Sequence, residues 1–292
     1  MEEKMENNGT FTLMPMSQQI SLTAGETYEG SITVVNPADA TEDFVYKTKV
    51  TPYGVVGEDY KADLLSTSKY TAMSEWIKIE EPTGKVKPNE SKKIHFKIKV
   101  PKDAPAGGQY ATIAVSSDQS NSASSGVAVQ NVFEMASIIY ATVAGETKHE
   151  GEILDNYVPS FVLSGPVKLT ASVSNNGNIH ETATVVITAS DFFTGNVILP
   201  NDEVDGQFAE IIMPDTTRYI EREVSNLPAL GVVKVSQTIY YQGKDPSVVE
   251  KNIIICPVWF LLLVILTIIA IISAIVFIIR KHLRRKKAAS AL

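Results

Sequence analysis

The sequence predicts an all-β fold of two tandem immunoglobulin-like β-sandwiches, followed by one transmembrane α-helix. Three observations lead to this fold class. Short runs of β-branched and apolar residues recur before Ile253, separated by Gly, Pro, Asn and Asp, which is typical of sandwiches. The two halves of this region repeat one order of strands and turns. The run Val258–Ile279 carries no charged residue.

The clearest single strand is Lys93–Lys99, where side chains alternate strictly. Ile94, Phe96 and Ile98 point one way, and the lysines and His95 point the other. This period of two predicts an antiparallel strand with one buried and one solvated face. We therefore expect His95 to be solvated.

The repeat covers most of the region before the apolar run. In each copy a strand ends at an Asn-containing turn and a second strand returns. A Pro-containing turn then leads a third strand, and a Gly opens the last. The copies are Gly30–Lys49, Lys87–Pro101 and Gly107–Val115, then Lys168–Thr188, Met213–Pro228 and Gly231–Tyr241. We predict a disordered N-terminus at 1–10 and domains at 11–148 and 149–255, each large enough to fold alone.

The apolar run, with Pro257 before it, predicts a transmembrane helix at 257–279. At about 1.5 Å per residue it spans roughly 33 Å, enough for a hydrocarbon core of about 30 Å. A basic tail follows at 280–292 and places that end in the cytoplasm by the positive-inside rule. The residues expected at the membrane interface are Trp259, Arg280, Lys281, Arg284 and Arg285.

Charge separates the two sides of this helix. The chain has 26 Lys and Arg against 33 Asp and Glu, and the tail after Ile279 contains only basic ones. A basic tail suits anionic membrane lipid, whereas an acidic ectodomain argues against nucleic acid as a partner. An external N-terminal part needs an export signal, and Met1–Thr10 has no apolar core of that kind. Either a signal was removed, or the start is misassigned, or the protein is tail-anchored with its bulk in the cytoplasm.

No pattern for catalysis, cofactor binding or a metal site is found. The histidines at 95, 149, 180 and 282 are scattered, so we expect no zinc site, and His180, like His95, is expected to be solvated. Trp76 is expected in the core, although an exposed ring for sugar stacking is the alternative. Acidic loop residues leave calcium binding open beside plain solubility. These are Asp39, Glu42, Asp43, Asp202, Glu203 and Asp205.

Cys256 is the single cysteine, so no disulfide within the chain is possible. It lies at the membrane boundary, where it is either an unmodified thiol or a site for acylation or for pairing with a second chain.

Three turn-rich motifs carry a family resemblance. They are Leu22–Pro37 (LTAGETYEGSITVVNP), Lys87–Ser91 (KPNES) and Val100–Tyr110 (VPKDAPAGGQY). Together with Ser174–His180 (SNNGNIH), they resemble the ectodomains of WxL-interacting surface proteins of Gram-positive bacteria. The resemblance implies two immunoglobulin-like domains, a membrane helix and a short basic tail. It also implies that the first domain binds peptidoglycan and the second a surface or host partner.

From these observations we predict a membrane-anchored, non-enzymatic cell-surface binding or scaffold protein with a role in adhesion. It would recognise a cell-wall component or a surface protein through loops or exposed strand edges. The loops Gly54–Ser74 and Ser116–Gly126 supply the candidate contact residues, which are Tyr60, Tyr70, Ser120 and Asn121. The alternatives are an accessory or assembly subunit of a larger membrane complex, and an enzyme with an unrecognised site.

Overall fold

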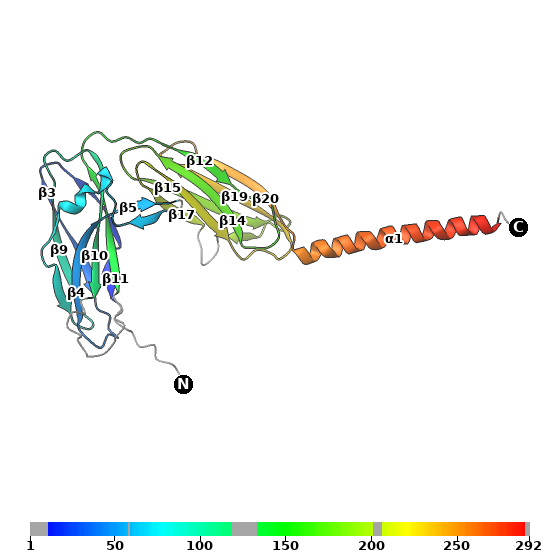
Figure 1. The fold of residues 1–292 in the computed structure, drawn as a ribbon, viewed down its shortest axis with the longest axis horizontal. Helices are drawn as coiled ribbons and strands as arrows, with labels where there is room; N and C mark the ends of the chain where they lie inside the picture. Colours follow the sequence, from blue (N-terminus) through cyan, green and yellow to red (C-terminus); the bar gives the residue numbers. More distant parts are fainter. Residues whose placement is uncertain (1–10, 58, 118–132, 201–205, 290–292) are drawn as a thin grey trace. The chain divides into compact units, whose positions relative to one another are not determined.

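The computed structural model describes residues 11–57, 59–117, 133–200 and 206–289, with side chains up to 281 in the last range. Figure 1 shows a region built mainly of β-strands, followed by a long helix. By its internal contacts the chain forms two compact units. The first unit comprises Met1–Glu152, Val173–Thr182 and Ile211–Tyr219, and the second comprises Ile153–Ser172, Ala183–Glu210 and Ile220–Leu292.

The first half of the chain forms two sheets, with strand orders β1-β3-β9-β7 and β2-β11-β10-β4-β8. The pairings are antiparallel except β2 with β11, which is parallel. The bounds are β1 (Thr12–Met14), β2 (Ser17–Leu22), β3 (Thr27–Val35), β4 (Phe44–Pro52), β7 (Ile77–Ile79), β8 (Thr83–Val86), β9 (Ser91–Lys99), β10 (Gly107–Ser117) and β11 (Glu134–Val143).

The second half also forms two sheets, with orders β12-β14-β18 and β13-β20-β19-β15-β16, and β17 pairs with β15. The bounds are β12 (Gly151–Tyr157), β13 (Phe161–Val162), β14 (Val167–Asn175), β15 (Glu181–Asp191), β16 (Val197–Leu199), β17 (Gln207–Ile212), β18 (Thr216–Val224), β19 (Gly231–Tyr241) and β20 (Ser247–Ile255). The predicted fold class of two immunoglobulin-like sandwiches with one helix is confirmed.

The sheets also contain the repeat seen in the sequence. β3 and β9 lie side by side in the smaller sheet of the first half, as β14 and β18 do in the second. β4 and β10 are neighbours in the larger sheet, as are β15 and β19. Each larger sheet also has one parallel strand, β2 on β11 and β13 on β20. The strands flanking each Asn-containing turn belong to different sheets, so each turn is a crossing between the layers of a sandwich.

The predicted alternation of β9 is present in the structure. Ile94, Phe96 and Ile98 are buried in the core, and His95 is exposed on the opposite face, as expected. Trp76 is half-buried and packs against the same core, which favours the expected core role.

The region 54–74 differs from the expected long surface loop. It contains a short hairpin, β5 (Gly54–Val56) with β6 (Lys61–Asp63), and the start of a 3₁₀ helix, η1 (Lys69–Glu75). The Ser68 side chain accepts from the backbone N–H of Tyr70 and begins that helix. Alternation is absent because these elements are too short to show a period.

The helix α1 spans Val258–Ala289. Its stretch Val258–Lys281 is long and apolar enough to cross a membrane, with a mean hydropathy of 3.4, and its apolar window has no residue buried within the chain. Within the described residues, no protein core therefore covers this apolar stretch.

One buried asparagine stands at the layer crossing of the first half. Asn36 follows β3, is 3% exposed, and donates from Nδ2 to the carbonyl of Val86 (2.9 Å) and to that of Glu42 (3.0 Å). Val86 is the last residue of β8. The Asn36 amide thus joins the crossing between β3 and β4 to the end of β8.

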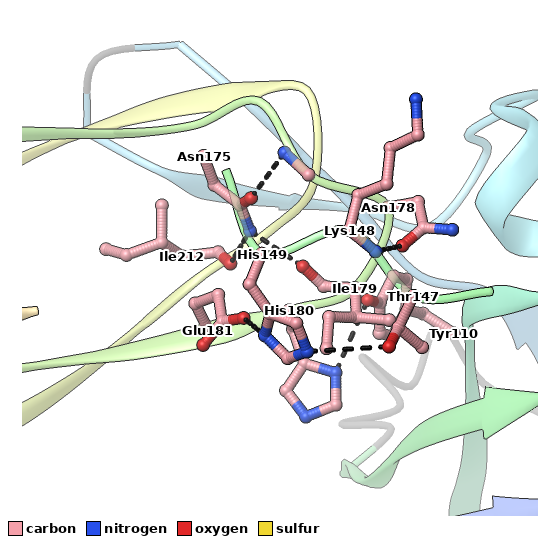
Figure 2. Close-up of polar contacts among 11 residues, drawn as sticks. Tyr110, Thr147, Lys148, His149, Asn175, Asn178, Ile179, His180, Glu181 and Ile212 are labelled. Carbon is pink, nitrogen blue, oxygen red and sulfur yellow. Dashed lines mark hydrogen bonds and ion pairs between the residues drawn. The ribbon is translucent and has the colours of Figure 1, made fainter. Parts of the chain in front are cut away.

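The second half has the matching asparagine. Asn175 ends β14, is fully buried, and donates from Nδ2 to the carbonyls of Ile212 (2.9 Å) and Ile179 (2.8 Å), as Figure 2 shows. Ile212 ends β17, and a proline follows two residues later, as one does after Val86. The same physical device therefore occurs once in each copy of the repeat.

We predict that Asn175→Ala lowers local stability by about 2 to 3 kcal/mol, because it leaves two carbonyls without a donor and removes a buried side chain. Hydrogen exchange of the amides in 173–182 and 211–219 measures the change in the full chain. The matched control is Asn176→Ala, at the exposed neighbouring position. Equal protection in the two variants would contradict this role.

Candidate binding site

A cluster of aromatic side chains lies within the first unit. We use the name aromatic cluster for the following residues, against which Met213 packs: Tyr53, Tyr60, Tyr70, Tyr110, Tyr140 and His180. Tyr110 on β10 and Tyr140 on β11 are its buried centre, with ring centroids 5.9 Å apart. The loop 53–70 and the segments 173–182 and 211–219 supply the rest. Two of the four predicted contact residues, Tyr60 and Tyr70, are therefore brought together in one apolar group.

The Tyr60 hydroxyl is fully engaged within this cluster. It accepts from the backbone N–H of Met213 at 2.5 Å and lies 2.7 Å from the Thr216 hydroxyl. The Arg218 guanidinium lies over the ring, 4.6 Å from its centroid. Burial raises the pKa of Tyr60. The residue thus holds the segment 211–219 in place.

Tyr70 makes a similar contact nearer the surface. Its hydroxyl donates to Asp215 Oδ2 at 2.9 Å, and Lys69 Nζ lies 3.0 Å from the same oxygen. Burial raises the pKa of Asp215, but the bonds from Lys69 and Tyr70 outweigh it, and the pKa is lowered overall. Whether Tyr60 or Tyr70 also contacts a partner stays a prediction.

His180 is placed differently from the solvated position that we expected. It is half-buried, and its ring lies 5.6 Å from that of Tyr110 and 5.3 Å from that of Tyr140. Its Nδ1 is 3.3 Å from the Tyr110 hydroxyl (Figure 2). Burial lowers the pKa of His180 below its ordinary 6.5. A residue after a turn was expected to face water, but the rings beside His180 are those of Tyr110 and Tyr140.

The turn before His180 is held by side-chain amides. Asn175 Oδ1 accepts from the N–H of Gly177 at 2.9 Å, and Asn178 Oδ1 accepts from the N–H of Lys148 at 2.7 Å (Figure 2). A Cβ on Gly177 would lie 2.2 Å from the Lys148 carbonyl oxygen. A side chain at this position would collide with the backbone, so the close approach of the turn to Lys148 requires glycine.

A second candidate surface is the open edge of β3. β1 pairs only with Thr33–Val35, and among the described residues no second strand pairs with Thr27–Ile32. At the two ends of β3, the Val100 N–H donates to the Glu26 carbonyl and the Asn36 N–H donates to the Glu90 carbonyl. The even-numbered residues of β3 are therefore the ones whose backbone groups bond to β9.

Antiparallel bonds come from alternate residues, so the odd-numbered residues of β3 direct their N–H and C=O groups to the open side. We define the open edge as Thr27, Glu29 and Ser31. Their side chains lie on the outer face, where Glu29 pairs with Lys97 at 3.0 Å. Such an edge can accept a strand from another chain.

The remaining predicted residues are placed as follows. Ser120 and Asn121 lie outside the described residues, as do Asp202, Glu203 and Asp205. Trp259, Arg280 and Lys281 are exposed on α1, and Arg284 and Arg285 belong to the same helix. Within the described ranges, no group of three or more His, Cys, Asp or Glu could hold a metal ion. Asp43 instead pairs with Lys85.

Comparisons with known proteins give a fold likeness only. No protein-family model and no curated protein matches the chain. Among solved structures, the class 5 fimbriae chaperone CfaA is 12% identical, with a TM-score of 0.41, covering 83% of this chain and 99% of that one. A chain of the CsuC–CsuE chaperone–tip adhesion subunit complex of Acinetobacter baumannii is 13% identical, with a TM-score of 0.40, covering 83% and 98%. The strand pairing of the chain itself defines the class, which is a protein of two immunoglobulin-like β-sandwiches followed by the apolar helix α1.

We predict that the stability of the segment around His180 falls as the pH is lowered from about 7.5 to about 5. The unfolded histidine takes up a proton near its ordinary pKa, whereas the half-buried one, whose pKa is lowered, does so only at a lower pH. The unfolded state therefore binds more protons in this window. Hydrogen exchange of 173–182, corrected for intrinsic rates, measures the loss. His180→Phe should remove it and the surface control His95→Gln should keep it, whereas an unchanged loss in His180→Phe would contradict the assignment.

We also predict that Tyr60→Phe destabilises the segment 211–219 by about 1 to 2 kcal/mol, because the Met213 N–H loses its acceptor. Protease susceptibility of this segment in the full chain is the measurement. Tyr240→Phe, at an exposed tyrosine, is the control. If both variants are cut at the same rate, Tyr60 does not hold this segment.

Proposed function

We propose that this chain is a membrane-anchored, non-enzymatic surface protein of the WxL-interacting kind. It binds a surface protein or a cell-wall component, and the binding element is the open edge of β3. The observation that carries this proposal is the open edge at Thr27, Glu29 and Ser31, where no second strand pairs with β3 in the part of the chain that the structure describes. The apolar surface of α1, which lacks a covering core, supports the anchor.

Strand addition fits the chemistry of this edge. The inward side chains Tyr28 and Ile32 belong to the core or pack against it, so β3 is fixed before a partner arrives. A rigid strand loses little conformational entropy on pairing, which favours affinity from main-chain bonds. The outer face is polar, with Glu29 beside Lys97, so the selectivity of this edge would come from polar and charged partner side chains.

A proline on the open edge tests this proposal. Ser31→Pro removes one outward N–H and disturbs pairing at its neighbours, while the bonds to β9 come from the adjacent residues. We predict binding to isolated Gram-positive cell walls that retain their surface proteins to be weaker by about fivefold or more, since about 1 kcal/mol is lost per main-chain bond. Ser31→Ala, which keeps the N–H, is the matched control and should bind normally.

Walls stripped of protein separate the two ligand classes, because binding that survives stripping points to the wall polymer. Hydrogen exchange of β9 checks that Ser31→Pro is folded. Equal wall binding by the folded proline and alanine variants would overturn the edge as the binding element. A partner retained through α1 instead would favour the accessory-subunit alternative.

A further inference from the structure

The end of the second sandwich at which α1 begins carries a set of exposed apolar loops. In the larger sheet Ile255, the last residue of β20, pairs with Gly231 at the start of β19 and with Val162 of β13. Asp191, the end of β15, pairs with Val233. The loops next to these positions therefore meet at one end of the sheet.

We define the apolar rim as Phe161, Leu163, Phe192, Phe193 and Leu230, all of the second unit. Each is exposed, and Phe193 is 76% exposed. The segments that contain them, 158–166, 192–197 and 225–232, have no charged residue. An ideal Cβ on Gly165 would lie 3.8 Å from the Leu227 side chain, which places the first and third loops side by side. Exposed apolar loops without charge are unusual on a face that meets only water.

The Phe192–Phe193 loop is held in a fixed shape. Asp191 Oδ1 accepts from the backbone N–H of Phe193 (3.0 Å) and of Thr194 (2.7 Å), and from the Thr194 hydroxyl (2.8 Å). The two rings meet edge to face at 5.2 Å. The loop presents both rings outward instead of folding them back onto the sheet.

The membrane helix begins very close to this rim along the chain. The Cys256 N–H donates to the Val162 carbonyl at 3.0 Å. The backbone bonds of the sheet therefore continue to Cys256, two residues before the first residue of α1. Cys256 and Pro257 alone form the link, with a reach of about 10 Å at most. Neighbouring strands lie about 4.8 Å apart, so the rim lies within about three strand widths of the point where the chain meets the lipid.

We propose that the apolar rim docks into the lipid–water interface of the bilayer that α1 spans. The inference rests on the membrane anchor of the proposed function. Aromatic side chains favour this interface, and Trp259 on the first turn of α1 is placed to join them. The rim would hold the second sandwich on the membrane surface instead of leaving it free on its two-residue link.

Fluorescence quenching in vesicles tests this docking. The full chain with Cys256→Ser is given one labelled cysteine at a time, by Phe193→Cys, Leu230→Cys, Val248→Cys or Ser273→Cys. Val248 is exposed near the start of β20, away from the rim, and Ser273 lies within α1. The vesicles contain phosphatidylglycerol and phospholipids with a nitroxide near the top of the acyl chain.

The proposal predicts quenching and a blue shift of the label at positions 193, 230 and 273, and neither effect at 248. Adding Phe192→Ser and Phe193→Ser to the Leu230→Cys protein should abolish quenching at 230. Quenching at 273 alone would overturn docking and leave the anchor intact. No quenching at 273 would refute the anchor, and the docking proposal with it.

Discussion

The two buried asparagines, Asn36 and Asn175, are the constraint on which both sandwiches depend. Each stands where the chain leaves the smaller sheet for the larger one, and each amide donates to two carbonyls. A crossing between layers takes backbone groups out of both sheets, and these need partners once buried. Only a side chain with two N–H donors on a short stem meets this need, so aspartate, although similar in shape, would not.

The same constraint explains why the repeat was visible in the sequence. Each asparagine bonds to the residue that ends a strand two positions before a proline, Val86 before Pro88 and Ile212 before Pro214. The next residue adopts a positive φ in both copies, 61° at Asn89 and 56° at Asp215. Turn residues and the alternation of β9 depend only on neighbours in the sequence, so both could be predicted from the sequence. The assignment of flanking strands to different sheets is non-local and needed the structure.

The candidate site was only half predictable, because its contacts join residues that are far apart in the sequence. Tyr60 and Tyr70 were selected as loop residues, and the structure gives their hydroxyls to Met213, Thr216 and Asp215, all distant in sequence. Tyr110 and His180 were missed because their contact joins residues that are 70 apart. A single sequence shows that a strand is apolar but does not show which turn lies over it. The open edge of β3 is likewise defined by where a neighbouring strand stops.

We propose that the β region lies outside the cell and the basic tail inside, and the proposed function depends on this orientation. Protease treatment of intact cells, with epitopes in the first sandwich and after Lys287, tests it most directly. We expect loss of the epitope in the first sandwich, while the tail epitope stays protected. A protected first sandwich in intact cells that becomes cleavable on lysis would contradict it and place the β region in the cytoplasm.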